Sequence, residues 1–238
     1  MQAPRIVLLH GSVVNGEATW AAQLGLASRF ELVVPNRRGF PPGPDVERVD
    51  YDDEAVWLDR YLEPGTHLVG HSYGGVISLL AAGRRPELLR SLTVVEPPAF
   101  TLTRGNPIAD AFVAGGNRLW TQGPRDPEAF LRAFLDSVGA SAPPGRLSAG
   151  LLQGARTLMV ERPPWEAEIP VEALAQAPFP KLVVSGGHSA AFDAVCDVLE
   201  RELPAERAVL RGAGHSVQRL GAPFNALLTA FVERAEAA

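Results

Sequence analysis

A serine between two glycines is the residue of this chain best suited to nucleophilic chemistry. Ser72 lies in the sequence Gly-His-Ser-Tyr-Gly, residues 70–74, which is a G-x-S-x-G pattern. An apolar run ends at the first glycine and a helix-compatible run, 76–82, follows at once, so the pattern indicates a strand, a tight turn and a helix. Glycine on both sides lets strand and helix approach closely while the turn exposes the hydroxyl. Three fixed residues are a weak motif, but the flanking elements favour a nucleophile over an idle serine in a glycine-rich turn.

A histidine must activate such a serine, because a neutral hydroxyl is a poor nucleophile without a base whose pKa is near 7. Five histidines are present. His215 lies in a glycine-rich loop, 212–216, between the last apolar run and the last helical stretch, and it follows the serine in the chain order usual for this turn. We therefore interpret His215 as the base. His188 is interpreted as a pocket or loop residue, and His10 as a brace of the first loop.

Acyl transfer also needs two N–H donors for the oxyanion. The amide of Tyr73, next to the serine, is one. The second is expected in the loop after the first apolar run, where Gly11 permits close backbone approach. We assign it to the amide of Ser12, with Val13 as the alternative.

The elements that must position these groups follow an alternating order. Six apolar runs without polar alternation predict buried parallel strands at 5–9, 31–35, 67–69, 91–96, 181–185 and 207–210. Helical patterns lie between them at 18–29, 52–62, 76–84, 192–202 and 223–235. Strand alternating with helix predicts an α/β fold with a mostly parallel, doubly wound sheet of about six strands.

One interval, between Glu96 and Lys181, contains no convincing strand. Helical segments are predicted there at about 109–120, 127–138 and 146–160, separated by Gly-Pro and Pro-Pro breakers. We expect a core of residues 1–98 and 179–238 and an all-helical cap of residues 99–178 over the carboxyl edge of the sheet, where ligands bind in such folds. The alternative is a helical layer remote from the site.

The chain resembles the α/β-hydrolases that carry a helical cap, in the esterase, perhydrolase and carbon–carbon hydrolase group. The resemblance rests on five segments in the family's order, at residues 10–12, 35–40, 70–74, 180–184 and 212–215. It implies a mostly parallel sheet that here lacks the family's first two strands, because the chain begins just before the oxyanion strand.

Two positions depart from the family pattern. Asn36 replaces the aspartate of an Asp-x-Arg-Gly turn, and Ser189 stands where the acid of the triad commonly lies. Some members carry the acid one strand earlier, which implies Glu96 at the end of an apolar strand, where a carboxylate is costly unless paired. Asp193 is the alternative acid, although it also suits the first turn of a helix. A water-assisted dyad is the third possibility.

Composition excludes several classes of function. The chain has 238 residues, 46 % of them hydrophobic, and a net charge of −5, so no basic surface for nucleic acid or anionic membrane is expected. The single Cys196 is interpreted as core and suits a cytoplasmic protein. Neither a dinucleotide fingerprint, a phosphate loop nor a metal-ligand spacing occurs, so no cofactor or metal is expected. The oligomeric state is not readable from the sequence.

We expect a cofactor-free serine hydrolase that cleaves an ester-like or activated carbonyl bond of a small to medium, largely apolar substrate. Carbon–carbon hydrolase, lyase or perhydrolase chemistry on the same triad is an alternative, and a ligand-binding or signalling protein with slow turnover is another. The residues considered as pocket wall, or equally as core of the cap, are Phe100, Phe112, Leu119, Trp120, Phe130, Phe134, Met159 and Trp165, together with His188.

Overall fold

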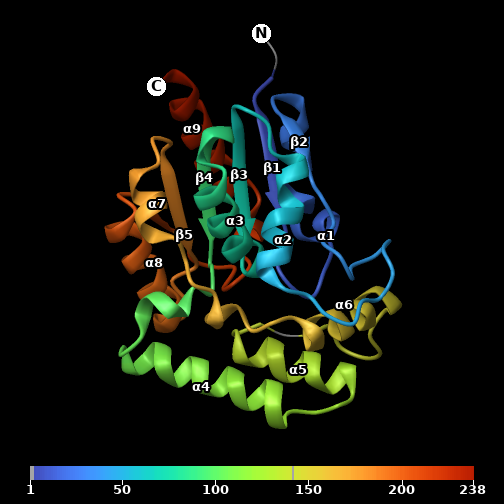
Figure 1. Cartoon of the computed structure of the whole chain (residues 1–238). Coiled ribbons are helices and arrows are strands. Elements are labelled where there is room, and N and C mark those ends of the chain that lie inside the picture. Colours follow the sequence, from blue (N-terminus) through green and yellow to red (C-terminus); the bar gives the residue numbers. More distant parts are fainter. Residues whose placement is uncertain (1–2, 141) are drawn as a thin grey trace.

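Six parallel strands form a single sheet at the centre of the molecule (Figure 1). The computed structural model describes residues 3–140 and 142–238; the first two residues of the predicted core and residue 141 of the predicted cap lie outside the described residues. The spatial order is β2-β1-β3-β4-β5-β6. The strands are β1 (Arg5–Leu9), β2 (Glu31–Val33), β3 (Thr66–His71), β4 (Leu89–Val95), β5 (Lys181–Ser185) and β6 (Glu206–Val209). The predicted α/β class and parallel sheet are confirmed.

Helices cover both faces of the sheet, which explains why the strands do not alternate apolar and polar residues. The α-helices are α1 (Gly16–Trp20), α2 (Tyr51–Leu58), α3 (Tyr73–Arg84), α4 (Pro107–Gln122), α5 (Pro127–Ser137), α6 (Ala149–Val160), α7 (Val171–Gln176), α8 (Ala190–Glu202) and α9 (Ala222–Ala237). One apolar core lies between the sheet and α2, α3 and α8. The second lies under α9, where Phe224, Leu228, Phe231 and Val232 are buried as their spacing predicts.

The expected helix at 18–29 is the main local difference. The chain forms the short helix α1 and then a 3₁₀ helix, η1 (Ala21–Ser28). Gly25 lies in this segment and Gln23 is its one buried residue, so low helix propensity and a small apolar face explain the tighter, irregular winding. Helix α7, in the proline-dense return, was not expected. Among the described residues, none of the helices combines the length and apolarity needed to cross a membrane.

Helices α4, α5 and α6 lie across the edge of the sheet opposite the two chain termini (Figure 1). Each begins at a residue whose side chain accepts backbone hydrogen bonds, namely Asn106, Asp126 and Ser148. Their small core contains Phe130, Leu131, Leu147, Ala155 and Leu158, and it includes Val13 from the loop after β1. The three helices are therefore packed on the site edge, as the predicted cap requires, while its boundaries as a separate unit remain a prediction.

Strand register brings four chain segments together at that edge. Leu9 pairs with Gly70, and Val95 pairs with both His71 and Val184. Because all the strands run in the same direction, the loops that follow β1, β3, β4 and β5 leave the sheet side by side. The predicted Ser12, Ser72, Glu96 and His188 lie in these loops, and His215 lies in the loop after β6, which pairs with β5.

Candidate active site

Ser72 occupies a strained turn between β3 and α3. Its backbone has φ 53° and ψ −125°, a conformation that side-chain-bearing residues rarely adopt. A Cβ at Gly70 would lie 2.3 Å from the Ser78 hydroxyl, and one at Gly74 would lie 2.4 Å from the His10 carbonyl oxygen. Only glycine fits at these two positions, so the sequence pattern reflects close approach of strand, helix and the β1 loop.

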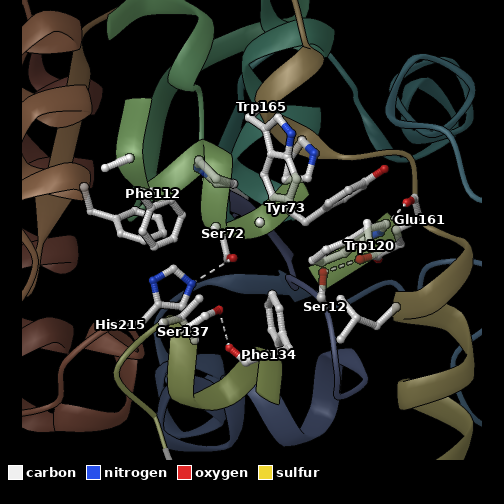
Figure 2. Close-up of a pocket in the computed structure, with 18 residues that line it drawn as sticks. Ser12, Ser72, Tyr73, Phe112, Trp120, Phe134, Ser137, Glu161, Trp165 and His215 are labelled. Atoms are coloured by element: carbon white, nitrogen blue, oxygen red, sulfur yellow. Dashed lines mark hydrogen bonds between the residues drawn. The ribbon is translucent and has the colours of Figure 1, made fainter. Parts of the chain in front are cut away.

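A line of hydrogen bonds runs from Ser72 through His215 to Glu96. The Ser72 Oγ and His215 Nε2 are 2.8 Å apart (Figure 2), and His215 Nδ1 lies 3.2 Å from Glu96 Oε2. When Glu96 is ionised its carboxylate can only accept, and His215 then carries its hydrogen on Nδ1 and presents a lone pair to the serine hydroxyl. The structure thus brings together the three residues that the sequence singled out as nucleophile, base and first-choice acid.

Glu96 is held one residue beyond the end of β4. Its backbone φ is 50° and its side chain is fully buried, with Oε1 accepting a 2.6 Å hydrogen bond from the Gly186 amide. Burial raises the pKa of Glu96 to about 7, although the Gly186 hydrogen bond and the nearby His188 oppose the shift.

Burial, and secondarily His188, lowers the pKa of His215 to about 3. The resting imidazole is therefore neutral, so Nε2 is free to accept the serine proton, and the charge of Glu96 is needed to stabilise the imidazolium that forms.

Asp193, the alternative acid, lies elsewhere. Its carboxylate accepts a 2.6 Å hydrogen bond from the Ser185 hydroxyl and a 3.2 Å bond from Arg207. It occupies the first turn of α8, where the helix dipole favours an acid. Among the described residues it makes no hydrogen bond to a histidine, so geometry favours Glu96.

Ser12 and Tyr73 are the residues whose backbone amides were predicted to hold the oxyanion. Tyr73 is the first residue of α3, whose amide has no partner within the helix. The amide of Ser12 has no acceptor among the described residues. Ser12 and Tyr73 both line the cavity at Ser72. Val13, the alternative, has φ 80°, and its carbonyl oxygen is pressed against Gly154 of α6.

A buried charge network that the sequence did not reveal holds this loop. The Ser12 hydroxyl donates to Glu161 Oε2 at 2.5 Å (Figure 2), and Arg37 donates to Glu161 Oε1 at 2.8 Å. Arg37 also donates to Glu54 at 2.5 Å and to the Gly11 carbonyl at 3.0 Å. Burial raises the pKa of Glu161, partly offset by Arg37 and Ser12. Two carboxylates therefore share one fully buried guanidinium.

The predicted role of His10 as a brace fits the same loop. Its Nδ1 lies 2.8 Å from the Gly11 carbonyl oxygen, and its Nε2 accepts the Arg37 amide at 2.9 Å. Burial, and then Arg37, lowers the pKa of His10 well below its usual value, so the ring is neutral. His10 thus supports the loop and lies outside the Ser72 hydrogen-bond line.

A cavity of about 190 Å³ opens above Ser72 beneath the helices α4 to α6. Its apolar wall includes four aromatic residues considered from sequence, Phe112, Trp120, Phe134 and Trp165, which surround the Ser72 hydroxyl in Figure 2. Ser137, Phe192 and Glu161 also line the cavity and were not predicted from the sequence. A second cavity, of about 140 Å³, shares Ser12, Ser72 and His215 with the first and is more polar, with Arg219 in its wall.

Two predicted pocket residues are corrected by the structure. Phe100 lies behind the cavity wall, with its ring 4.9 Å from Phe112 and 5.4 Å from Phe192. The ring of His188 stacks on Phe192 at 6.1 Å, and its Nδ1 lies 3.7 Å from Glu96. Neither lines the cavity at Ser72. Phe192, which does line the cavity, belongs to α8 of the core. The sequence-based expectation had drawn its aromatic wall residues from the predicted cap alone. The residues Leu119, Phe130 and Met159 also pack within the helical layer.

Comparison with known proteins agrees with this geometry. The sequence profile described as the alpha/beta hydrolase family matches residues 6–227. The chain belongs to this family. Its relatives include proteins named as hydrolases and esterases, in line with the activity that the ordered motifs predicted.

Several relatives of this chain carry enzyme names. It is 28% identical over 144 residues to 2-(acetamidomethylene)succinate hydrolase of Mesorhizobium japonicum, covering 58% of this chain and 51% of that protein. It is 35% identical over 124 residues to pimeloyl-[acyl-carrier protein] methyl ester esterase of Aeromonas hydrophila, covering 50% of this chain and 48% of that protein. The chain spans about half the length of these curated relatives. MenH from S. aureus has the same fold, with a TM-score of 0.71 at 16% identity over 99% of this chain and 96% of that one.

Among the described residues, one group of side chains could hold a metal ion. Glu96, His188 and His215 each offer a ligand atom, and the three atoms lie within 4.8 Å of one another. The sequence showed no metal-binding spacing because the three residues follow three different strands. Two of the three also belong to the Ser72 hydrogen-bond line.

Proposed function

We propose that this hydrolase is a cofactor-independent serine esterase that cleaves an ester-like or activated carbonyl bond through an acyl-enzyme on Ser72. The observation that carries the proposal is the line Ser72–His215–Glu96, with a neutral imidazole 2.8 Å from the serine hydroxyl at the floor of an apolar cavity. Nothing in this arrangement requires a group from outside the chain.

In the proposed mechanism Ser72 Oγ attacks the carbonyl carbon while its proton moves to His215 Nε2. Glu96 stabilises the imidazolium, and the amides of Ser12 and Tyr73 hold the oxyanion. The imidazolium then protonates the departing alcohol. Water activated by His215 attacks the acyl-enzyme and restores Ser72.

Cavity shape supports a small to medium, largely apolar acyl group. The larger apolar cavity accommodates the acyl side, because its walls are mainly aromatic. The second, more polar cavity accommodates the alcohol side, since the two cavities meet at Ser72 and His215. A relative named as a methyl ester esterase is consistent with this division.

Replacement of Ser72 tests the proposal directly. Wild-type protein should be labelled by a fluorophosphonate probe and should turn over short p-nitrophenyl esters. Ser72→Ala should lose labelling and at least about a thousandfold in kcat, because the covalent route is removed. Ser137→Ala is the matched control, since this cavity serine only donates to the Phe134 carbonyl and should leave both readouts intact.

Two outcomes would contradict the esterase. Full activity in Ser72→Ala would remove the acyl-enzyme. Stoichiometric labelling of wild-type protein without turnover on any ester of the series would indicate a ligand-binding protein that keeps the pocket.

A further inference from the structure

Glu96 and His188 lie close to Nδ1 of His215, on the side of the ring that faces away from Ser72. Besides the 3.2 Å contact between His215 Nδ1 and Glu96 Oε2, His188 Nδ1 lies 3.7 Å from Glu96 Oε1. Two imidazoles and one carboxylate are a ligand set that zinc uses in proteins. We propose that Glu96, His188 and His215 form a Zn²⁺ site and that bound zinc switches the hydrolase off.

The separations are close to those of a zinc site. Zn–N and Zn–O distances of about 2.0–2.2 Å place tetrahedral ligand atoms roughly 3.3 Å apart. The 3.2 Å separation between His215 Nδ1 and Glu96 Oε2 matches that value, and one ligand atom from each of the three residues lies within 4.8 Å of the other two, His188 lying nearest to the other carboxylate oxygen. A modest shift of one side chain completes the set.

His188 is the side chain placed to make that shift. It belongs to the loop between β5 and α8, directly after Gly187, whose φ is 57°. Two glycines leave space beside its ring, since a Cβ at Gly139 or Gly214 would lie 3.4 or 4.0 Å from it. Its side chain is 17 % exposed, whereas Glu96 is fully buried, so zinc and a fourth, water ligand would arrive from the His188 side.

The carboxylate is already oriented for this role. The Gly186 amide occupies Glu96 Oε1, which leaves Oε2 directed at His215. A hydrogen bond that fixes a ligating carboxylate in this way usually raises metal affinity. The nearest other carboxylate, Asp193, is engaged by Arg207 and Ser185, so it does not compete for the ion.

Inhibition follows from the hydrogen that His215 carries, and this step rests on the proposed function. Zinc on Nδ1 takes the position of the Nδ1 hydrogen, and the neutral ring keeps its single hydrogen on Nε2 instead. Nε2 then points a hydrogen, not a lone pair, at Ser72 Oγ. The ring can no longer accept the serine proton, and Glu96 no longer orients it.

Kinetics distinguish this mechanism from blockage of the pocket. His188 does not line the cavity at Ser72. Zinc should therefore lower kcat on p-nitrophenyl esters with little change in KM, and EDTA should restore activity.

The test compares zinc titrations of wild-type protein and His188→Gln. The variant should keep basal kcat within about threefold, because the ring touches neither the cavity nor Ser72, and its half-inhibitory zinc concentration should rise at least about tenfold. Glu236→Gln is the control. It removes a separate histidine–carboxylate contact, 3.3 Å from His67 at the other end of β3, and should leave zinc sensitivity unchanged.

Binding is read independently of activity. Zinc should raise the Tm of wild-type protein and of Ser72→Ala alike, and it should not do so for His188→Gln. These Tm measurements still report on the site if the esterase proposal fails. Equal zinc-dependent Tm shifts in wild-type and His188→Gln would overturn the site, and zinc bound without loss of turnover would overturn the switch.

Discussion

Glu96 combines two features that are each unfavourable to the stability of the folded chain. Its backbone φ is positive, and its carboxylate is fully buried. The hydrogen bonds to the Gly186 amide and the His215 ring offset part of the free energy that burial of the carboxylate costs. The effect of Glu96 on the His215 imidazole explains why a residue with these features occupies this position.

Replacing the acid without changing its shape isolates that effect. Glu96→Gln should lower kcat on p-nitrophenyl esters by about 10³–10⁴-fold, because a neutral amide neither fixes the Nδ1–H tautomer nor stabilises the imidazolium. Asp193→Asn is the matched control and should stay near wild-type kcat, since its carboxylate contacts Ser185 and Arg207. The assignment of Glu96 is wrong if only the second variant collapses.

Glu161 should affect the pH dependence of stability. The charged groups around it are Arg37 and, through Arg37, Glu54, while Ser12 faces its other oxygen. Because burial raises the pKa of Glu161, the folded chain binds a proton that the unfolded chain releases near pH 4.5. The raised pKa therefore makes the folded state less stable as the pH rises above this value.

Glu161→Gln removes the charge but keeps an oxygen that can accept from Ser12 or Arg37. Its free energy of unfolding, measured by urea denaturation, should fall less between about pH 5 and pH 7 than that of wild-type protein. Glu161→Ala should instead lose roughly 3 kcal/mol at neutral pH, because Arg37 and Ser12 both lose a buried partner. Parallel pH profiles for wild-type and Glu161→Gln would contradict the predicted contribution of Glu161.

At the scale of elements, helix α6 and the loop after β1 are in direct backbone contact. A Cβ on Gly154 would lie 1.8 Å from the Val13 carbonyl oxygen. Val13 follows Ser12, whose amide we propose as an oxyanion donor. The distance between α6 and this loop should therefore bear on catalysis as well as on packing.

Gly154→Ala tests that coupling. The methyl group must displace either helix or loop, so kcat on p-nitrophenyl esters should fall by about tenfold or more, with a lower Tm. Gly150→Ala, one turn earlier in α6, is the matched control. Its Cβ would meet only Pro41 at 3.8 Å, and alanine favours the helix by up to about 1 kcal/mol, so activity should be kept and Tm held or raised. Equal behaviour of the two variants would show that the contact is not coupled to catalysis.

At the scale of the whole molecule, the features that could be predicted from the sequence are those that short stretches of residues determine. Continuous apolar runs identified the parallel strands, and the glycines around Ser72 and His215 marked the turns that the sheet brings together. Glu161 was missed because it lies 124 residues from Arg37 and 149 from Ser12, so no spacing relates them. Phe192 and Phe100 were misjudged for a similar reason, since packing between α4 and α8 decides which aromatic ring faces the cavity.

The position of Glu96 has a consequence for engineering. Ser72 lies between β3 and α3, and Glu96 directly follows β4. The distance between these two residues is therefore set by the continuous unit β3–α3–β4, which precedes the helices α4 to α6 in the chain. Those helices can be exchanged for others of different length without changing that spacing. A graft of this kind would also have to keep an acceptor for Ser12 and Arg37 in place, because Glu161 directly follows α6. A change of substrate would therefore require new aromatic residues in the cavity wall while a carboxylate is kept at the position of Glu161.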